Sequence, residues 1–198
     1  VGPGGPGGFG GGAAANVRGT DALLHHLGSG RSQFLGSVGD AAFNRKGDLL
    51  AYSVEATPKD GNGLFVVDLA TSGSHVLDND ARTYSRIAWN DSGTGVAALK
   101  GKEVPRMREK ENVLLVIPAA RVAIEGKAAT TQFTFDSTVA GFKKGWVISD
   151  RATLDWSDDN KRVFFGIMGQ TSAPDTSRRR STDSLANVDV WRTQDERI

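Results

Sequence analysis

Histidines beside carboxylates are the first residues in this chain that could do chemistry. The sequence has three histidines, the adjacent pair His25 and His26 and the isolated His75. Neighbouring side chains of a strand point to opposite faces, so the pair is poorly placed to bind one metal ion together. His75 stands near Asp78 and Asp80, but the serine next to it lacks the turn that exposes a catalytic nucleophile. We therefore predict no catalytic role for the three histidines and expect them to face solvent from strands.

Carboxylates gather at Asp78 and Asp80, and again at Asp155, Asp158 and Asp159. Neither group has the spacing of a calcium loop, and both fall where strands are expected to end, so we predict plain turn chemistry there. The sequence has no cysteine and no G-x-S-x-G motif. These absences exclude thiolate catalysis, disulfides and a nucleophile elbow within these residues. We predict no catalytic, cofactor-binding or metal-binding residue.

Two segments of biased composition also invite a functional interpretation. Residues 5–10 match G-x-G-x-x-G, but no strand precedes them, no helix follows, and Pro6 interrupts the match. We expect residues 1–19 to be a Gly-rich insertion between strands or a tail. The three arginines at 178–180 lie in a polar segment without interleaved aromatics. We expect them to be solvated or to meet an acidic surface of the same parent protein.

The overall charge and hydropathy limit the partners. The formal net charge is +1, which gives no general attraction to nucleic acid or to an anionic membrane. No apolar run approaches the roughly 18 residues that span a bilayer. We therefore expect neither nucleic acid nor membrane as a partner. The first residues lack a signal peptide and an initiator methionine, so we expect the natural start to be missing, and the compartment is left open.

A repeated pattern of aromatic residue, polar turn and strand-forming run organises the chain. It occurs at Phe43, Trp89 and Trp156, which are separated by 46 and 67 residues. The turns are rich in Asn, Asp, Ser and Gly, which supply the positive φ angles and local hydrogen bonds of tight hairpins. The strand-forming runs that follow are 49–54, 95–99 and 162–168. Each copy therefore predicts strand, hairpin turn and strand, with the two tryptophans packed between neighbouring units.

A second repeat interleaves with the first. Residues 19–35 align without gaps on residues 61–77, and residues 111–126 and 187–195 look like later, less regular copies. Four short strands that recur every 40–50 residues are typical of β-propeller blades. The sequence therefore predicts an all-β fold: a partial β-propeller of roughly three four-stranded antiparallel blades, open at both ends.

The repeats also set the expected domain boundaries. We expect half a blade at 20–37, a blade at 38–80, a blade with an insertion at 81–145, and an incomplete blade at 146–198. The insertion is placed around 126–146, where the spacing between repeats is longest.

The connections between the second and third strand of each unit should all project from one face of a propeller. They are 1–19, 55–63, 101–112 and 169–187. Because functional variation concentrates in such loops, we expect any partner or substrate to be met on this face.

Several stretches resemble a known family. Residues 19–101, "GWVISDRATLDWSDDNKRVFFGI" (145–167) and "NVDVWRTQDERI" (187–198) resemble the propeller of bacterial prolyl oligopeptidase family serine peptidases. The resemblance implies a propeller that caps an α/β-hydrolase domain with a Ser-Asp-His triad and admits short peptides but not folded proteins. No triad residue can be assigned to a position in this chain. The resemblance therefore implies a non-catalytic propeller segment, a scaffold and substrate-access filter for a hydrolase domain outside this chain.

An alternative is an interaction propeller of the TolB-like or tryptophan-aspartate-repeat kind, with no enzymatic activity. The sequence beyond Ile198 discriminates the two, because a G-x-S-x-G motif there favours the peptidase. The expected partners are the remaining blades, the hydrolase domain and the peptide substrates of the parent protein. Roughly three blades cannot close a ring, so the isolated chain is expected to associate with itself through its open ends.

Overall fold

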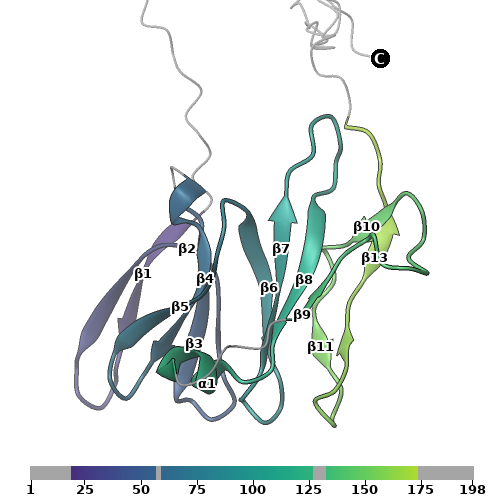
Figure 1. Ribbon diagram of the computed structural model, residues 1–198. Helices are drawn as coiled ribbons and strands as arrows, with labels where there is room; N and C mark the ends of the chain where they lie inside the picture. Colours follow the sequence, from purple (N-terminus) through teal and green to yellow (C-terminus); the bar gives the residue numbers. More distant parts are fainter. Residues whose placement is uncertain (1–18, 57–58, 127–132, 174–198) are drawn as a thin grey trace, which may run out of the picture.

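The computed structural model describes residues 19–56, 59–126 and 133–173. Nearly all regular structure in these residues is antiparallel sheet (Figure 1). The sheets follow one another in chain order and do not close into a ring. The expected fold class, an all-β partial propeller that is open, is thereby confirmed. The first eighteen residues, the arginines at 178–180 and the copy at 187–195 lie outside the described residues.

The first sheet contains five strands in chain order. They are β1 (Thr20–His25), β2 (Ser32–Phe43), β3 (Leu49–Val54), β4 (Gly63–Asp68) and β5 (Gly73–Asn79). A 3-10 turn, η1 (Lys59–Gly61), precedes β4. The turn between β2 and β3 closes at Gly47, which has φ 68°, as the hairpin pattern predicts.

The expected boundary between residues 37 and 38 falls inside strand β2. Ser37 adopts a left-handed conformation with φ 52°, and the pairing of β2 with β3 shifts register between Val38 and Ala41. This bulge bends the strand without ending it. Leu35 consequently packs in one apolar cluster with Leu50 and its neighbours, so the β1–β2 hairpin folds over one face of the same sheet. Residues 20–37 and 38–80 are therefore joined in a single five-stranded sheet.

The second sheet has the order β6-β7-β8-β9. Its strands are β6 (Thr83–Trp89), β7 (Val96–Lys102), β8 (Glu111–Ile117) and β9 (Phe133–Phe135). One helix, α1 (Ala120–Glu125), leads from β8 into the expected insertion. No helix in the described part of the chain is long and apolar enough to cross a membrane.

The third unit consists of two short ladders rather than one sheet. Strand β10 (Trp146–Ile148) pairs with β13 (Ile167–Gly169), and β11 (Asp155–Trp156) pairs with β12 (Val163–Phe164). The single strand expected at 162–168 is therefore interrupted. The interruption falls at Phe165 and Gly166, between β12 and β13, where the Gly166 carbonyl accepts a hydrogen bond from the backbone N–H of Ser149 at 2.9 Å.

Both faces of the middle sheet are buried, as a propeller blade requires. Val96 and Ala98 of β7 pack toward the first sheet, in a cluster that contains Leu49. The alternate residues Ala97 and Leu99 pack toward the third unit. Strands of an ordinary antiparallel sheet bury only one face. The two-sided burial of β7 therefore places the middle sheet between two neighbouring units.

Candidate functional site

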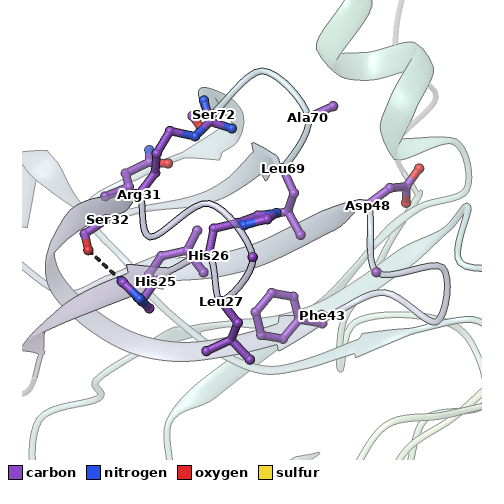
Figure 2. A pocket seen from close by; sticks show the side chains of 14 residues that line it. His25, His26, Leu27, Arg31, Ser32, Phe43, Asp48, Leu69, Ala70 and Ser72 are labelled. Atoms are coloured by element: carbon purple, nitrogen blue, oxygen red, sulfur yellow. Dashed lines mark hydrogen bonds between the residues drawn. The ribbon is translucent and has the colours of Figure 1, made fainter.

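A hollow lies at the turn that joins β1 to β2 (Figure 2). This N-terminal cleft has a volume of about 920 Å³. Its wall carries the histidine pair, His25 and His26, together with Arg31, and its apolar side carries Leu69 and Phe43. It is therefore the place where the sequence candidates for histidine chemistry must be tested.

The histidines of the N-terminal cleft stabilise the turn around them. Nδ1 of His26 accepts the backbone N–H of Ser29 at 2.9 Å, and the Ser29 hydroxyl lies 3.0 Å from the same nitrogen. Nδ1 of His25 lies 2.8 Å from the hydroxyl of Ser32 across the hairpin. The His26 nitrogen that would serve as a base is thus engaged by a backbone N–H, and no carboxylate bonds to either ring among the described residues. This geometry is that of a turn motif rather than of a nucleophile and its base.

The N-terminal cleft occupies a position that is filled in the other units. Trp89 and Trp156 each contact the preceding sheet, and the indole N–H donates to a backbone carbonyl there: Trp89 to Ala42 at 2.8 Å, and Trp156 to Ala88 at 3.1 Å. The equivalent Phe43 is 57% exposed in the cleft. The expected packing role of the tryptophans is confirmed. The N-terminal cleft lies at the equivalent surface of the first sheet, where no preceding unit is present among the described residues to cover Phe43.

A second repeated link between units was not anticipated from the sequence. Asn62 and Asn112 lie at the start of equivalent strands: Asn62 directly precedes β4, and Asn112 is the second residue of β8. Both side chains are almost fully buried. Nδ2 of Asn62 donates to the carbonyl of Arg82 at 3.2 Å, and Nδ2 of Asn112 donates to the carbonyl of Ile148 at 2.8 Å. The sequence does contain a repeated Asn-x-Leu pattern, in "NGLFVV" (62–67) and "NVLLVI" (112–117). The pattern does not by itself predict a link between units, because a polar residue at the start of a strand is commonplace.

The carboxylates Asp78 and Asp80 join the first two sheets. Lys100 donates to Asp78 at 2.8 Å and lies 3.0 Å from Asp80, and the hydroxyl of Tyr84 donates to Asp78 at 2.7 Å. The hydrogen bond from Lys100 lowers the pKa of Asp80, whereas burial and the bond to Asp78 raise the pKa of Tyr84. None of these bonds involves His75. The pair forms an inter-sheet ion cluster, not a catalytic dyad.

The other carboxylate group behaves as the turn chemistry predicts. Asp159 accepts the hydroxyl of Ser157 at 2.6 Å and the backbone N–H of Lys161 at 3.1 Å. These bonds lower the pKa of Asp159. Within residues 19–56, 59–126 and 133–173, no three His, Asp or Glu side chains come together as a metal-binding group.

The loops expected to share one face can be followed in two units. The β7–β8 loop pairs with the segment after β13: Met107 bridges Ser172, and the backbone N–H of Arg108 donates to Thr171 at 2.9 Å. The Gln170 side chain completes the contact, because its amide donates to the Glu109 carbonyl at 2.8 Å. We call this link, residues 106–109 with 170–173, the loop strap. Figure 1 shows the loop strap and η1 at the same end of the sheets.

Beneath the loop strap lies a smaller hollow of about 310 Å³, which we call the strap pocket. Its residues come from the β7–β8 loop and the first residue of β8, from the segment before β10 and the start of β10, and from the residue after β13. They are Val104, Met107, Glu111, Ser137, Lys143, Lys144, Gly145, Trp146, Val147 and Gln170. This site could not be predicted from the sequence, because its residues are drawn from three segments that only the fold brings together.

Comparisons with known proteins add partial likenesses. No protein-family model and no curated protein matches the chain. The acylaminoacyl peptidase of Pyrococcus horikoshii is 17% identical, with a TM-score of 0.42, over 59% of this chain and 21% of that chain. The β-propeller domain of the Trilobed protease from Pyrococcus furiosus is 13% identical, with a TM-score of 0.42, over 57% of this chain and 34% of that chain. This chain thus spans about a fifth of the first protein and a third of the second, and the fold assignment rests on the sheets themselves.

Proposed function

We propose that this chain is a non-catalytic propeller segment of a serine-type oligopeptidase. It serves as a scaffold and as a filter that restricts substrate access to an α/β-hydrolase domain outside these residues. The main support for the proposal is the family-like sequence at residues 145–167, together with the packing of that stretch against the second unit.

The contacts of this stretch support a scaffolding role. The carbonyl of Ile148 accepts Asn112, and the carbonyl of Asp150 accepts the Arg86 guanidinium, so the motif ties the third unit to the second. The indole of Trp156 adds a third such bond, to Ala88. The residues that carry the resemblance therefore fix one propeller unit against the next.

Apolar side chains at both outer faces support the proposed partnership with further blades. Leu23 and Phe34 are register partners on the outer side of the β1–β2 hairpin, and each is 66% exposed. Phe164 of β12, in the third unit and so at the other end of the row of units, is 71% exposed. Side chains of this size normally gain a few kcal/mol, about 2 each, from burial. Blades supplied by the parent protein are the partners that would cover them.

The filter is tested with one cleavable sequence presented in two ways to the full-length gene product. The first substrate is a short free peptide, and the second carries the same sequence in a surface loop of a folded protein. We expect cleavage of the free peptide only. Equal cleavage of both substrates would contradict the filter. Cleavage of neither by a folded, full-length protein would favour the interaction propeller.

A further inference from the structure

We infer that the strap pocket binds the carboxylate of a peptide whose neighbouring side chain is apolar. Met107 and Gln170 of the loop strap line the strap pocket, and the loop strap lies at the same end of the sheets as η1 (Figure 1). The inference rests on the proposed function only in taking the ligand to be a peptide. The inference goes beyond the proposed function, because it names a binding site, the strap pocket, and the chemical group that the site would bind, a carboxylate.

The charges of the strap pocket favour an anion. Lys143 and Lys144 lie side by side in the chain at its rim, and both are exposed. The Lys143 ammonium is held over the ring of Trp146, 3.7 Å from its centroid. Lys144 forms no ion pair with any described residue. Glu111 is the single acidic residue in the lining, so the pocket carries an excess of positive charge.

The interior of the strap pocket suits an apolar group. Val104, Met107, Trp146 and Val147 contribute apolar surface beside the lysines. A methionine adapts its shape to different side chains, which suits a site for peptides of varied sequence. An anion bound next to this surface would present its apolar part to the wall and its charge to the two ammonium groups.

The wall of the strap pocket is fixed before any ligand arrives. The backbone N–H of Gln170 donates to Gly145 at 2.9 Å, while its side-chain oxygen accepts the backbone N–H of Glu109 at 3.1 Å. Gln170 thus ties the β7–β8 loop to the segment that carries the lysines. A site held by such bonds loses little conformational entropy on binding, which favours a specific ligand over loose ionic attraction.

The test uses the full-length protein and three tripeptides with N-methylated amide bonds, which resist cleavage during a titration. The first ends in leucine with a free carboxylate, the second is its C-terminal amide, and the third is an amide with an internal glutamate. Calorimetric titration measures the affinity of each. A double variant, Lys143→Ala with Lys144→Ala, removes the charge. The matched control, Lys46→Ala with Lys161→Ala, removes two exposed lysines from the hairpin turns at the opposite end of the sheets.

We expect the free acid to bind about fivefold more tightly than the amide, as two partly exposed ion pairs allow. The double variant should lose this preference, and the control should keep it. Tighter binding of the glutamate peptide than of the free acid would support the pocket and assign it to acidic side chains instead of C-termini. Equal binding of all three peptides, or a preference that survives loss of both lysines, would overturn the inference. Either result leaves the proposed peptidase function to its own test, because cleavage of a free peptide does not require binding in the strap pocket.

Discussion

The indole N–H of Trp89 donates a hydrogen bond to the carbonyl oxygen of Ala42 at 2.8 Å, across the interface between the first and second sheets. Trp156 repeats the relationship with Ala88 one unit later. In both pairs the acceptor is the residue before the aromatic of the preceding unit. The repeated aromatic of the sequence is therefore a link between blades.

Replacing Trp89 with Phe should destabilise the protein by about 1–2 kcal/mol, because the Ala42 carbonyl loses its donor and part of the ring contact is lost. Phe133→Leu is the control, since Phe133 of β9 is 57% exposed and has no N–H to donate. It should change the free energy of unfolding by less than about 0.5 kcal/mol. Denaturant unfolding of the full-length protein measures both. Similar costs for the two variants would contradict a specific role of the indole link.

The two buried asparagines should differ in importance. Asn62 satisfies two backbone groups, because it also accepts the N–H of Ala56 at 2.7 Å, whereas the side-chain oxygen of Asn112 has no partner among the described residues. Asn62→Ala should therefore cost about 2–3 kcal/mol and Asn112→Ala about 1 kcal/mol. The comparison uses the same unfolding measurement. A reversed order would show that the asparagine links do not act through these bonds.

Arg121 of α1 reaches back to the first sheet and makes stability depend on pH. It lies 2.8 Å from Asp48 and 3.1 Å from Asp68. The side chain of Asn44, together with Arg121, lowers the pKa of Asp48 below its ordinary value of 3.8. Burial alone would raise the pKa of Asp68, but its backbone hydrogen bonds and Arg121 outweigh burial and lower it. Stability from these carboxylates is thus fully present above about pH 4 and is lost as the pH falls through their lowered folded pKa values.

Arg121→Gln should lower the thermal midpoint at pH 7, and the difference from the natural protein should narrow below pH 3. The control is Arg45→Gln, which removes a well-exposed ion pair with Asp91 between two hairpin turns. That pair is open to water, so its loss should have little effect at any pH. Thermal scans of the full-length protein at pH 7 and at pH 2.5–3 measure the differences. A pH-independent effect of Arg121→Gln would contradict the ionic role of α1.

The loop strap can be tested by a disulfide. Met107 and Ser172 form an antiparallel bridge, a spacing that a disulfide can span. Because residues 1–198 contain no cysteine, Met107→Cys with Ser172→Cys should form one bond on oxidation, mapped by mass spectrometry. It should stabilise the protein by about 2–4 kcal/mol relative to its reduced form. Val104→Cys with Ser172→Cys is the control pair and should not crosslink efficiently. A failure of the Met107 pair to crosslink would contradict the strap.

The turn chemistry made most of the fold predictable from sequence. Gly47 and Gly93 have φ angles of 68° and 66°, and Asn160 has φ 55°, so the residues that the pattern singled out do close the three hairpins. The link from Trp89 to the neighbouring unit followed from its repeated position. Such features are local or periodic, and both kinds are visible in a single sequence.

The strap pocket and the continuous strand β2 could not be predicted in the same way. The pocket joins Met107 to Lys144 and Gln170, and no local pattern records that these segments meet. The bend at Ser37 depends on a left-handed backbone conformation that serine seldom adopts, so the sequence favoured a boundary where the strand only turns. Tertiary packing decided both outcomes.

Labelling the full-length gene product with a fluorophosphonate probe, followed by mapping of the labelled residue, shows whether this propeller segment serves a serine peptidase. We predict a label on one serine beyond Ile198 and none within residues 1–198. A label on a serine within residues 1–198, or no label on an intact and folded full-length protein, would contradict the proposed function.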